Sequence, residues 1–364
     1  MIERSRQTPP FPLYVRYPQL VTSLPRLALS PSPSPVTEVT RVSGKSFWVK
    51  NDGLYGILYG GNKPRKLELV LPDVQRQGKS TIVTLGALGT HHGLATALYA
   101  RQQSLRTVLL LVDQPVSDSV RRELCWLQQA GTVLIYTATA RRARLSLPLI
   151  MLRYVDWRRG KLPYLLPPGG SSLVGTVGFV NAALELADQI AAGELPEPET
   201  VVVTLGSGGT AAGLALGLRL AGLRSRLIAV RIGEHGTSET LARLANASAS
   251  LMRQRGAALP AGDIDPASIT VLTDWVGKGY GHSTPEAERA IALFTEKADL
   301  TLEHTYTAKT VAALLALLEN GHLDTGPTLY WHTYNALPVP LAEPGPEDYR
   351  RLPRSLHRFF NTEA

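Results

Sequence analysis

Cysteine is almost absent from this chain, since Cys125 is the only one in 364 residues. An intrachain disulfide and a cysteine-rich metal site are therefore excluded, and the composition fits a reducing compartment. Long apolar runs are also missing: no uninterrupted stretch approaches the roughly 20 residues of a membrane-spanning helix. Residues 1–6 lack the apolar core of a signal peptide. We expect a cytoplasmic protein that does not enter a membrane.

Acidic residues are in the minority, with 30 Asp and Glu against 38 Lys and Arg and a formal net charge of +8. The basic residues are densest between positions 141 and 161, where Leu145, Leu149 and Leu152 recur at helical spacing. Pro148 interrupts this pattern, so the helix is expected over 141–158 or only from Pro148 onward. We interpret the segment as a solvated basic helix with one apolar face, and expect no nucleic-acid partner.

The remaining composition, 44% hydrophobic and 19% charged, is that of a globular enzyme long enough for two lobes. Strand and helix signals alternate along most of the chain, which predicts parallel sheets with helices on their faces. Residues 1–40 are rich in proline and serine and are expected to form an extended arm, and residues 166–172 give the clearest hinge signal. Strands are expected at 46–50, 81–85, 107–112, 133–136, 162–166, 200–205, 227–232, 270–272 and 328–332, with helices near 91–104, 117–131 and 141–158.

The most informative segment is YGGNKPRKLE at 59–68, which places Lys63 at the start of a helix behind a glycine pair. Asn62 can serve as the N-cap, and Pro64 is tolerated in the first helical turn. The positive end of the helix dipole and the neighbouring Arg65 and Lys66 disfavour the ammonium form of Lys63 and lower its pKa. A neutral, positioned amine is what a Schiff-base lysine must be. A capped surface helix with basic residues is the alternative reading.

Two turns share the pattern TLGxxGT, at 84–90 and 204–210. Each ends a β-branched strand and opens a helix rich in small residues, so each gathers free backbone N–H groups at a helix N-terminus, where anions bind. The 204–210 turn has more glycine and lets a phosphate approach its backbone, whereas the 84–90 turn suits a carboxylate. Two ordinary strand-to-helix turns are the alternative, since a lone glycine-rich turn is weak support.

These features together resemble a known family. The GGNKPRKLE segment, the glycine-rich loop at 204–210, Tyr280 and Tyr306 are similar to those of the D-cysteine desulfhydrase and 1-aminocyclopropane-1-carboxylate (ACC) deaminase family, which are pyridoxal-phosphate enzymes of fold type II. The resemblance extends from about residue 50 to about residue 333. It implies an α/β protein of two domains, each with a mostly parallel twisted sheet flanked by helices, and a homodimer. The implied division is a small domain at 77–176 and a large cofactor domain at 41–76 and 177–364, preceded by the 1–40 arm.

The resemblance implies a role for each part of the cofactor site. Lys63 would form the Schiff base with pyridoxal phosphate and later accept the substrate α-proton; Lys66, three residues on, is the competitor for that role. The phosphate would lie on Ser207, Gly208, Gly209 and Thr210.

Two neighbouring residues on the first turn would contact substrate and cofactor. Thr90 would meet the substrate carboxylate, and His91, where family members often carry Asn, would meet the phenolic oxygen of the cofactor and could titrate. The adjacent His91 and His92 diverge on a helix and have no third ligand at usable spacing, so we expect no metal.

The partner of the pyridine nitrogen separates the chemistries within this family. The resemblance places Tyr280 and Tyr306 in the substrate pocket, and ACC deaminases carry a glutamate directly after the second tyrosine, where this chain has Thr307. The segment His332-Thr333 resembles the desulfhydrase motif whose threonine meets the ring nitrogen, although Tyr334 follows in place of glycine.

A hydroxyl makes the cofactor a weaker electron sink than a carboxylate does, which favours elimination of a β-leaving group. We therefore expect a lyase that acts on a small amino acid in the manner of D-cysteine desulfhydrase. ACC deamination, β-replacement, racemisation and a catalytically silent relative remain the alternatives.

Overall fold

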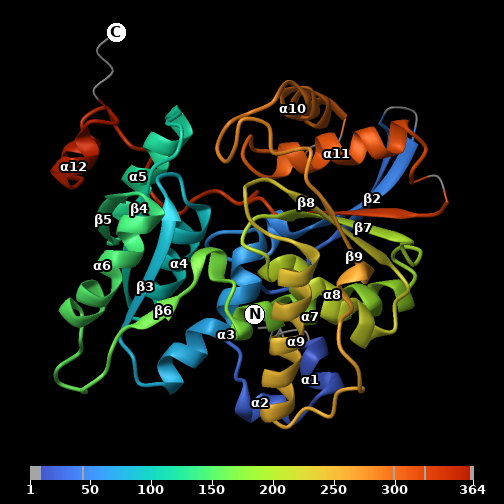
Figure 1. The fold of residues 1–364 in the computed structure, drawn as a ribbon, viewed down its shortest axis with the longest axis horizontal. Coiled ribbons are helices and arrows are strands. Elements are labelled where there is room, and N and C mark those ends of the chain that lie inside the picture. The colour runs from blue at the N-terminus through green and yellow to red at the C-terminus, as the bar shows by residue number, and fades with distance from the viewer. Residues whose placement is uncertain (1–9, 43–44, 298–299, 324, 361–364) are drawn as a thin grey trace, which may run out of the picture.

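A computed structural model describes residues 10–42, 45–297, 300–323 and 325–360. Within these ranges the chain forms two lobes, each built around its own sheet (Figure 1). Every pairing between the named strands is parallel except that of β1 with β2. The α/β class predicted from the alternating pattern, with two mostly parallel sheets, is confirmed.

The larger sheet has the strand order β1-β2-β10-β7-β8-β9. Its central strands are continuous runs of apolar and β-branched residues. Helices cover both faces of a parallel sheet, so the side chains on both faces of each central strand are buried. The carboxyl ends of β10 and β7 lie side by side, so the segments that follow them, 333–335 and 206–208, meet at one edge. The strand bounds are β1 Val36–Val42, β2 Lys45–Asn51, β7 Thr200–Leu205, β8 Arg226–Arg231, β9 Ile269–Leu272 and β10 Thr328–His332.

Helices cover the two faces of this sheet as separate layers (Figure 1). On one face α10 (Pro285–Lys297) and α11 (Thr307–Glu319) pack on Val202, Ile228 and Val230. The other face is covered by a group that includes α7 (Leu173–Ala191), α8 (Gly209–Ala221) and α9 (Ser238–Gln254). The N-terminal residues, expected as an extended arm, contribute α1 (Pro12–Arg16), α2 (Leu20–Ser23) and most of β1.

The smaller sheet has the order β5-β4-β3-β6 and belongs to the second lobe. Alternate residues of β4 face opposite layers: Leu109 and Leu111 pack with the helices α4 and α5, whereas Val108 and Leu110 pack under α6. This alternation explains how one apolar strand supports both layers. The bounds are β3 Thr81–Ala87, β4 Arg106–Val112, β5 Val133–Ala138 and β6 Tyr164–Leu166, with α4 His91–Gln102, α5 Asp118–Gln129 and α6 Ala140–Arg153.

Helix α6 runs without a break through Pro148, so the alternative of a later helix start is wrong. The helix starts upstream because the Thr139 side chain accepts a hydrogen bond from the Arg142 backbone N–H at 3.2 Å. Ala143 and Ile150, on either side of the proline, are both buried against the sheet, and this packing compensates for the backbone hydrogen bond that proline removes.

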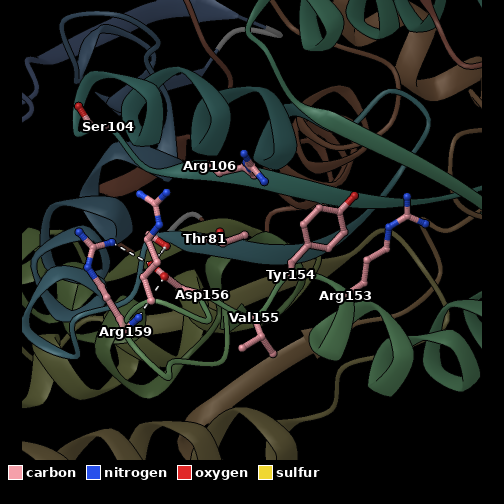
Figure 2. A pocket seen from close by; sticks show the side chains of 10 residues that line it. Thr81, Ser104, Arg106, Arg153, Tyr154, Val155, Asp156 and Arg159 are labelled. Atoms are coloured by element: carbon pink, nitrogen blue, oxygen red, sulfur yellow. Dashed lines mark hydrogen bonds and ion pairs between the residues drawn. The ribbon is translucent and has the colours of Figure 1, made fainter.

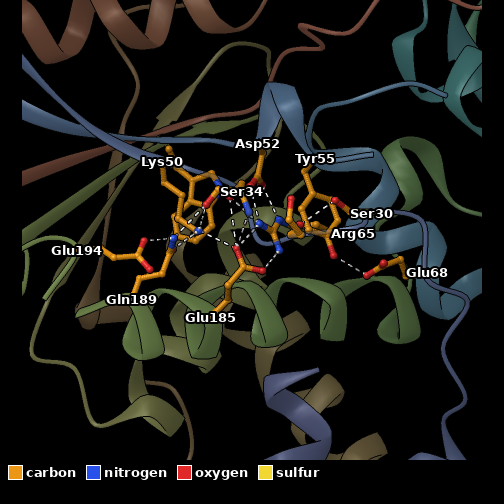
Figure 3. A network of polar contacts seen from close by, with 12 residues as sticks. Ser30, Ser34, Lys50, Asp52, Tyr55, Arg65, Glu68, Glu185, Gln189 and Glu194 are labelled. Atoms are coloured by element: carbon orange, nitrogen blue, oxygen red, sulfur yellow. Dashed lines mark hydrogen bonds and ion pairs between the residues drawn. The ribbon is translucent and has the colours of Figure 1, made fainter. Parts of the chain in front are cut away.

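The helix that carries Lys63, α3 (Asn62–Arg76), is anchored by a buried charge network (Figure 3). The Arg65 guanidinium donates to both oxygens of Asp52, at 2.7 and 2.8 Å, and to Glu185 on α7 at 2.9 and 3.0 Å. Lys50 on β2 donates to the same Glu185 at 2.7 Å. Two cations face two carboxylates away from water, so each charge is compensated and α3 is held to β2 and α7.

The short remaining elements are η1 (Asp52–Leu54), η2 (Pro168–Gly170), η3 (Pro266–Ser268), η4 (Asp348–Arg351) and α12 (Arg354–His357). Among the described residues, no helix is both long and apolar enough to cross a bilayer. The same residues contain no cluster of His, Cys, Asp and Glu that could hold a metal ion.

Candidate active site

Lys63 lies where the GGNKPRKLE segment meets the glycine-rich turn at 204–210. Helix α3 begins at Asn62, and the preceding Gly61 adopts φ +88°, where a Cβ would come within 2.6 Å of the Thr333 carbonyl oxygen. The Lys63 ammonium donates to Asn62 Oδ1 at 2.6 Å, and Asn62 Nδ2 donates to Thr210 Oγ1 at 3.1 Å. Asn62 therefore is not the N-cap that the sequence predicts; its side chain connects the lysine to the glycine-rich turn.

Burial controls the charge on this lysine. It lowers the pKa of Lys63 from 10.5 to about 8, against the opposing attraction of Glu303. The lowered pKa expected from the sequence is present, but its cause is burial, since Arg65 points away into the carboxylate network of Figure 3. The pKa of Lys66 is lowered well below its usual value, by burial and then by the charge of Lys63.

The turn after β7 has the shape of an anion cradle. Gly208 is the N-cap of α8 with φ +92°, a conformation that other residues rarely adopt, and a Cβ there would lie 3.2 Å from Leu241. The Gly209 N–H donates to Ser171 Oγ at 3.0 Å, and the Ser171 and Ser207 hydroxyls are 2.8 Å apart. The Gly209 N–H, two hydroxyls and the positive end of a 13-residue helix thus lie together, which is the composition of an anion site.

A second lysine lies beside this cradle. The Lys66 ammonium donates to the Gly169 carbonyl at 2.9 Å and to Ser171 Oγ at 3.2 Å. In the described part of the chain Lys66 forms no salt bridge, and a buried ammonium without a counter-charge is costly. A phosphate dianion on the cradle would supply that charge. Ser171 is not among the site residues expected from the sequence. The only sequence feature that includes it is the hinge signal at 166–172.

The first TLGxxGT turn positions Thr90 and His91 at the start of α4. Thr90 is the N-cap, and its Oγ accepts from the Gly93 N–H at 3.2 Å. A Cβ on Gly86 would lie 2.5 Å from this hydroxyl, so the motif glycine is required for Thr90 to pack on the end of β3. Thr90 is buried, and its hydroxyl hydrogen is not used by the capping bond.

His91 is held by two groups that the sequence did not reveal. Its Nδ1 lies 2.5 Å from Glu123 Oε1 and 3.1 Å from the Tyr59 hydroxyl. Burial lowers the pKa of His91, but the attraction and hydrogen bond of Glu123 outweigh burial and raise it above 6.5. His92 turns the other way and bonds Thr84 at 2.9 Å. No local pattern connects Glu123 on α5 to a histidine on α4, so only the fold brings them together.

Tyr280 and Tyr306 meet at the same site. Their hydroxyls are hydrogen-bonded to each other, and their rings lie 5.6 Å apart in a T-shaped arrangement. The Tyr306 ring is 6.2 Å from the His91 ring, and a Cβ on Gly206 would lie 3.3 Å from it. Burial raises the pKa of both phenols, so both stay protonated and able to donate near neutral pH.

The carboxylate of Glu303 is engaged in capping α11. Glu303 accepts from the backbone N–H of Tyr306 at 2.7 Å and of Thr307 at 2.8 Å, while its own N–H donates to Thr307 Oγ at 2.9 Å. Thr333, which follows β10, accepts from the Asn62 N–H at 3.2 Å through its carbonyl. A threonine therefore lies next to the lysine segment, and the nearby carboxylate is already bonded to the helix N-terminus.

Comparison with known proteins agrees with this geometry. Residues 27–333 match the family described as pyridoxal-phosphate dependent enzyme. The chain is 31% identical over 327 residues to a D-cysteine desulfhydrase of Klebsiella pneumoniae (strain 342), covering 87% of this chain and 96% of that protein. It is 32% identical over 323 residues to a D-cysteine desulfhydrase of Salmonella choleraesuis (strain SC-B67), with 87% and 95% covered.

A solved structure shows the same architecture. The crystal structure of an ACC deaminase homologue aligns with a TM-score of 0.74 at 27% identity, covering 89% of this chain and 94% of that chain. The residues present also fit the cofactor, since they supply a buried amine, a glycine-rich turn in which an added Cβ would meet its neighbours, and a second buried lysine that has no carboxylate partner among the described residues. The chain therefore belongs to the pyridoxal-phosphate dependent enzyme family, and pyridoxal phosphate is its cofactor.

Proposed function

We propose that this enzyme catalyses α,β-elimination on a small amino acid in the manner of D-cysteine desulfhydrase. Cysteine and water would yield pyruvate, ammonia and sulfide, with the Cβ–S bond broken and the α-proton removed. The observation that carries the proposal is that the Thr333 backbone lies against the Lys63 segment, where its carbonyl accepts from the Asn62 N–H, while the Glu303 carboxylate accepts from the N–H groups at the start of α11. With Glu303 bonded to the start of α11, a threonine hydroxyl would be the partner of the ring nitrogen, and such a site would suit a substrate whose β-leaving group takes the charge from Cα.

Lys63 is assigned the two central roles. Bound pyridoxal phosphate supplies an aldehyde for the substrate amine and a ring that withdraws electrons from Cα. Lys63 would hold the cofactor at rest and accept the α-proton once released, and its pKa of about 8 leaves part of the amine neutral near physiological pH. Lys66 bonds to Gly169 and Ser171 instead, which supports a role at the phosphate for this competitor.

The other predicted residues are assigned by their position around Lys63. Ser207, Gly208, Gly209 and Thr210 would hold the phosphate together with Ser171, which shares hydrogen bonds with Ser207 and Gly209.

The groups that face substrate come from both lobes. Thr90 would bind the substrate carboxylate, and His91 would donate to the phenolic oxygen of the cofactor. Tyr280 and Tyr306, kept protonated by burial, would line the substrate pocket and deliver a proton to the departing sulfur.

ACC deamination is the second candidate, favoured by the solved ACC deaminase homologue to which the chain is similar. Against it stands Thr307, whose hydroxyl accepts from the Glu303 N–H within the helix cap and leaves no acid at that position. β-Replacement and racemisation use the same groups and are separated only by products. A catalytically silent relative that binds the cofactor is separated by turnover.

A panel of D- and L-cysteine, ACC and D- and L-serine, offered to the purified holoenzyme, tests the proposal. Pyruvate and sulfide released from D-cysteine in equal amounts, and abolished in Lys63→Ala, are the expected result. A keto acid from ACC in preference to pyruvate from D-cysteine contradicts it and supports deamination. A visible cofactor band with no product from any substrate supports the silent relative.

The domain division and the setting of the enzyme complete the proposal. The arm at 1–40, the large domain at 41–76 with 177–364, and the small domain at 77–176 are proposed boundaries, supported by the separate sheets of the two lobes. A homodimer and a cytoplasmic location are proposed from the family resemblance and the single cysteine. Light scattering of the purified holoenzyme tests the dimer.

A further inference from the structure

Helix α6 presents an apolar face to solvent. Leu145, Leu149 and Leu152 are 70%, 72% and 56% exposed, whereas Ala143 and Ile150 on the opposite side are buried against the small sheet. The spacing of the three leucines, four and then three residues, places them in one outward stripe. The apolar face predicted from the sequence is therefore real, but it is not the face that packs on the protein.

The surroundings of this stripe are basic. Between Thr139 and Leu162 the only carboxylate is Asp156, and α6 itself has none. Trp157, just beyond the helix, is 79% exposed, and Leu162 is 50% exposed. The exposed cations of the segment are Arg141, Arg142, Arg144, Arg153, Arg158, Arg159 and Lys161.

A cavity of about 650 Å³ opens beside the same segment (Figure 2). Arg106, Arg153, Arg158 and Arg159 line it, and Arg159 pairs with Asp156 at 2.9 Å. In the described part of the chain the other three arginines form no salt bridge, so the cavity carries a net positive charge. It lies at the amino ends of β3 and β4, the opposite edge of the small sheet from Thr90 and His91.

We propose that α6 and the 154–162 segment form a docking surface for an anionic phospholipid bilayer. The leucine stripe and Trp157 would enter the interface between head groups and acyl chains, and the arginines of the stripe and of the cavity would bind lipid phosphates. An amphipathic helix that lies on a membrane has this composition, with apolar and aromatic residues on one face and Arg or Lys beside it.

Two other occupants fit the surface less well. A second copy of the chain, meeting this face with its own, would bring two clusters of arginine together with only Asp156 to offset them. A nucleic acid would satisfy the arginines but would leave Leu145 and Leu149 in water. A bilayer with anionic head groups satisfies both the charge and the apolar stripe.

The position of the surface leaves the active site accessible. Helix α6 packs on the side of the small sheet that carries Val83, Val108 and Leu110, whereas α4, which bears His91, packs on the other side. In Figure 1, α6 lies at the outer margin of the small lobe. Docking through α6 would therefore leave the site between the lobes free to take up substrate.

Vesicle sedimentation of the holoenzyme tests the proposal. We expect the protein to sediment with vesicles of phosphatidylcholine and phosphatidylglycerol and to stay in solution with phosphatidylcholine alone. Raising NaCl from about 0.1 to about 1 M, which shortens the screening length from about 10 to about 3 Å, should release it. Arg153→Gln with Arg158→Gln should weaken binding about 25-fold, because each cation near an anionic surface contributes about a factor of five.

Matched surface variants separate docking from general charge effects. Leu145→Glu with Leu149→Glu should abolish sedimentation while the visible cofactor band is kept, since both side chains are exposed. The control, Val15→Glu with Arg224→Gln, changes an apolar residue and a cation that are 68% and 93% exposed on the large lobe, and it should bind like the wild type.

Several results would overturn the proposal. Absence of wild-type binding to the anionic vesicles would do so, as would equal loss of binding in the control variant. A fall in molar mass by light scattering in the leucine variant, with vesicle binding unchanged, would assign the face to a second copy. Retention on single-stranded DNA without vesicle binding would assign it to a nucleic acid.

Discussion

The charge state of Lys63 yields a prediction with a magnitude that follows from burial. A lysine with a pKa of about 8 has about a tenth of its amine neutral at pH 7, whereas one with the ordinary value of 10.5 has about 3 parts in 10,000. The neutral fraction is therefore about 300 times larger. Because only the neutral amine attacks the cofactor aldehyde, uptake of pyridoxal phosphate by the apoprotein should rise with pH and level off above an apparent pKa of about 8.

Stopped-flow absorbance of the apoprotein mixed with pyridoxal phosphate, between about pH 6 and about pH 10, measures this dependence. Nα-acetyl-lysine at the same pH values is the matched reference, because it titrates near 10.5 and corrects for ionisation of the cofactor itself. Glu303→Gln should move the midpoint below that of the wild type, since the Glu303 charge favours the ammonium form. Lys63→Ala should give no borohydride-reducible adduct. A rate that still rises up to about pH 10 in parallel with that of Nα-acetyl-lysine, or an adduct in Lys63→Ala at the wild-type level, would contradict a lowered pKa of Lys63.

Three further predictions concern the anchor of α3, the phosphate turn and the ring partner. Burial raises the pKa of Glu185, but the charges of Arg65 and Lys50 outweigh burial and lower the pKa from 4.5 to about 2. This shift corresponds to about 3 kcal/mol of folding stability. The stabilisation is present above pH 4.5 and is lost as the pH falls to about 2. Glu185→Gln should therefore melt about 4 °C lower at pH 7 and lack that acid dependence in calorimetry; an unchanged melting temperature would contradict it. Gly208→Val should destabilise even the apoprotein by about 1–3 kcal/mol, because φ is +92° at this position. A variant with wild-type melting and wild-type cofactor affinity would refute both the strain and the phosphate role. Thr333→Ala should keep the visible cofactor band and slow turnover about fivefold, because one hydrogen bond of about 1 kcal/mol is lost. Unchanged turnover would show that Thr333 is not the partner of the ring nitrogen.

Short sequence patterns correctly predicted those elements whose formation depends on neighbouring residues in the chain. The β-branched runs of the larger sheet predicted β7 and β10 with the bounds that the structure shows, Thr200–Leu205 and Thr328–His332. The GGNKPRKLE segment, with its helix start behind glycine, placed Lys63 correctly at the beginning of α3. The family resemblance drawn from these motifs is confirmed, as is the cofactor.

Other features depend on packing that no short window contains. The start of α6 lies upstream of Pro148 because the flanking Ala143 and Ile150 both pack on the sheet, and a proline rule applied to the sequence cannot weigh that contact. The exposed leucine stripe of the same helix has a periodicity identical to that of a buried face. Hydrophobic spacing indicates that a face exists, and only the tertiary structure decides whether it points inward.

The sequence by itself determined the family, the cofactor, the parallel α/β architecture and the position of Lys63 at the start of a helix, because each is encoded in short motifs and periodic patterns along the chain. The tertiary structure alone decided the environment of those residues. It buried Lys63 and lowered its pKa, paired His91 with Glu123 from another helix, and brought Ser171 to the glycine-rich turn at 204–210. Burial and long-range pairing arise from segments far apart in the sequence, so they are set when the lobes pack and not by the order of residues within any one motif.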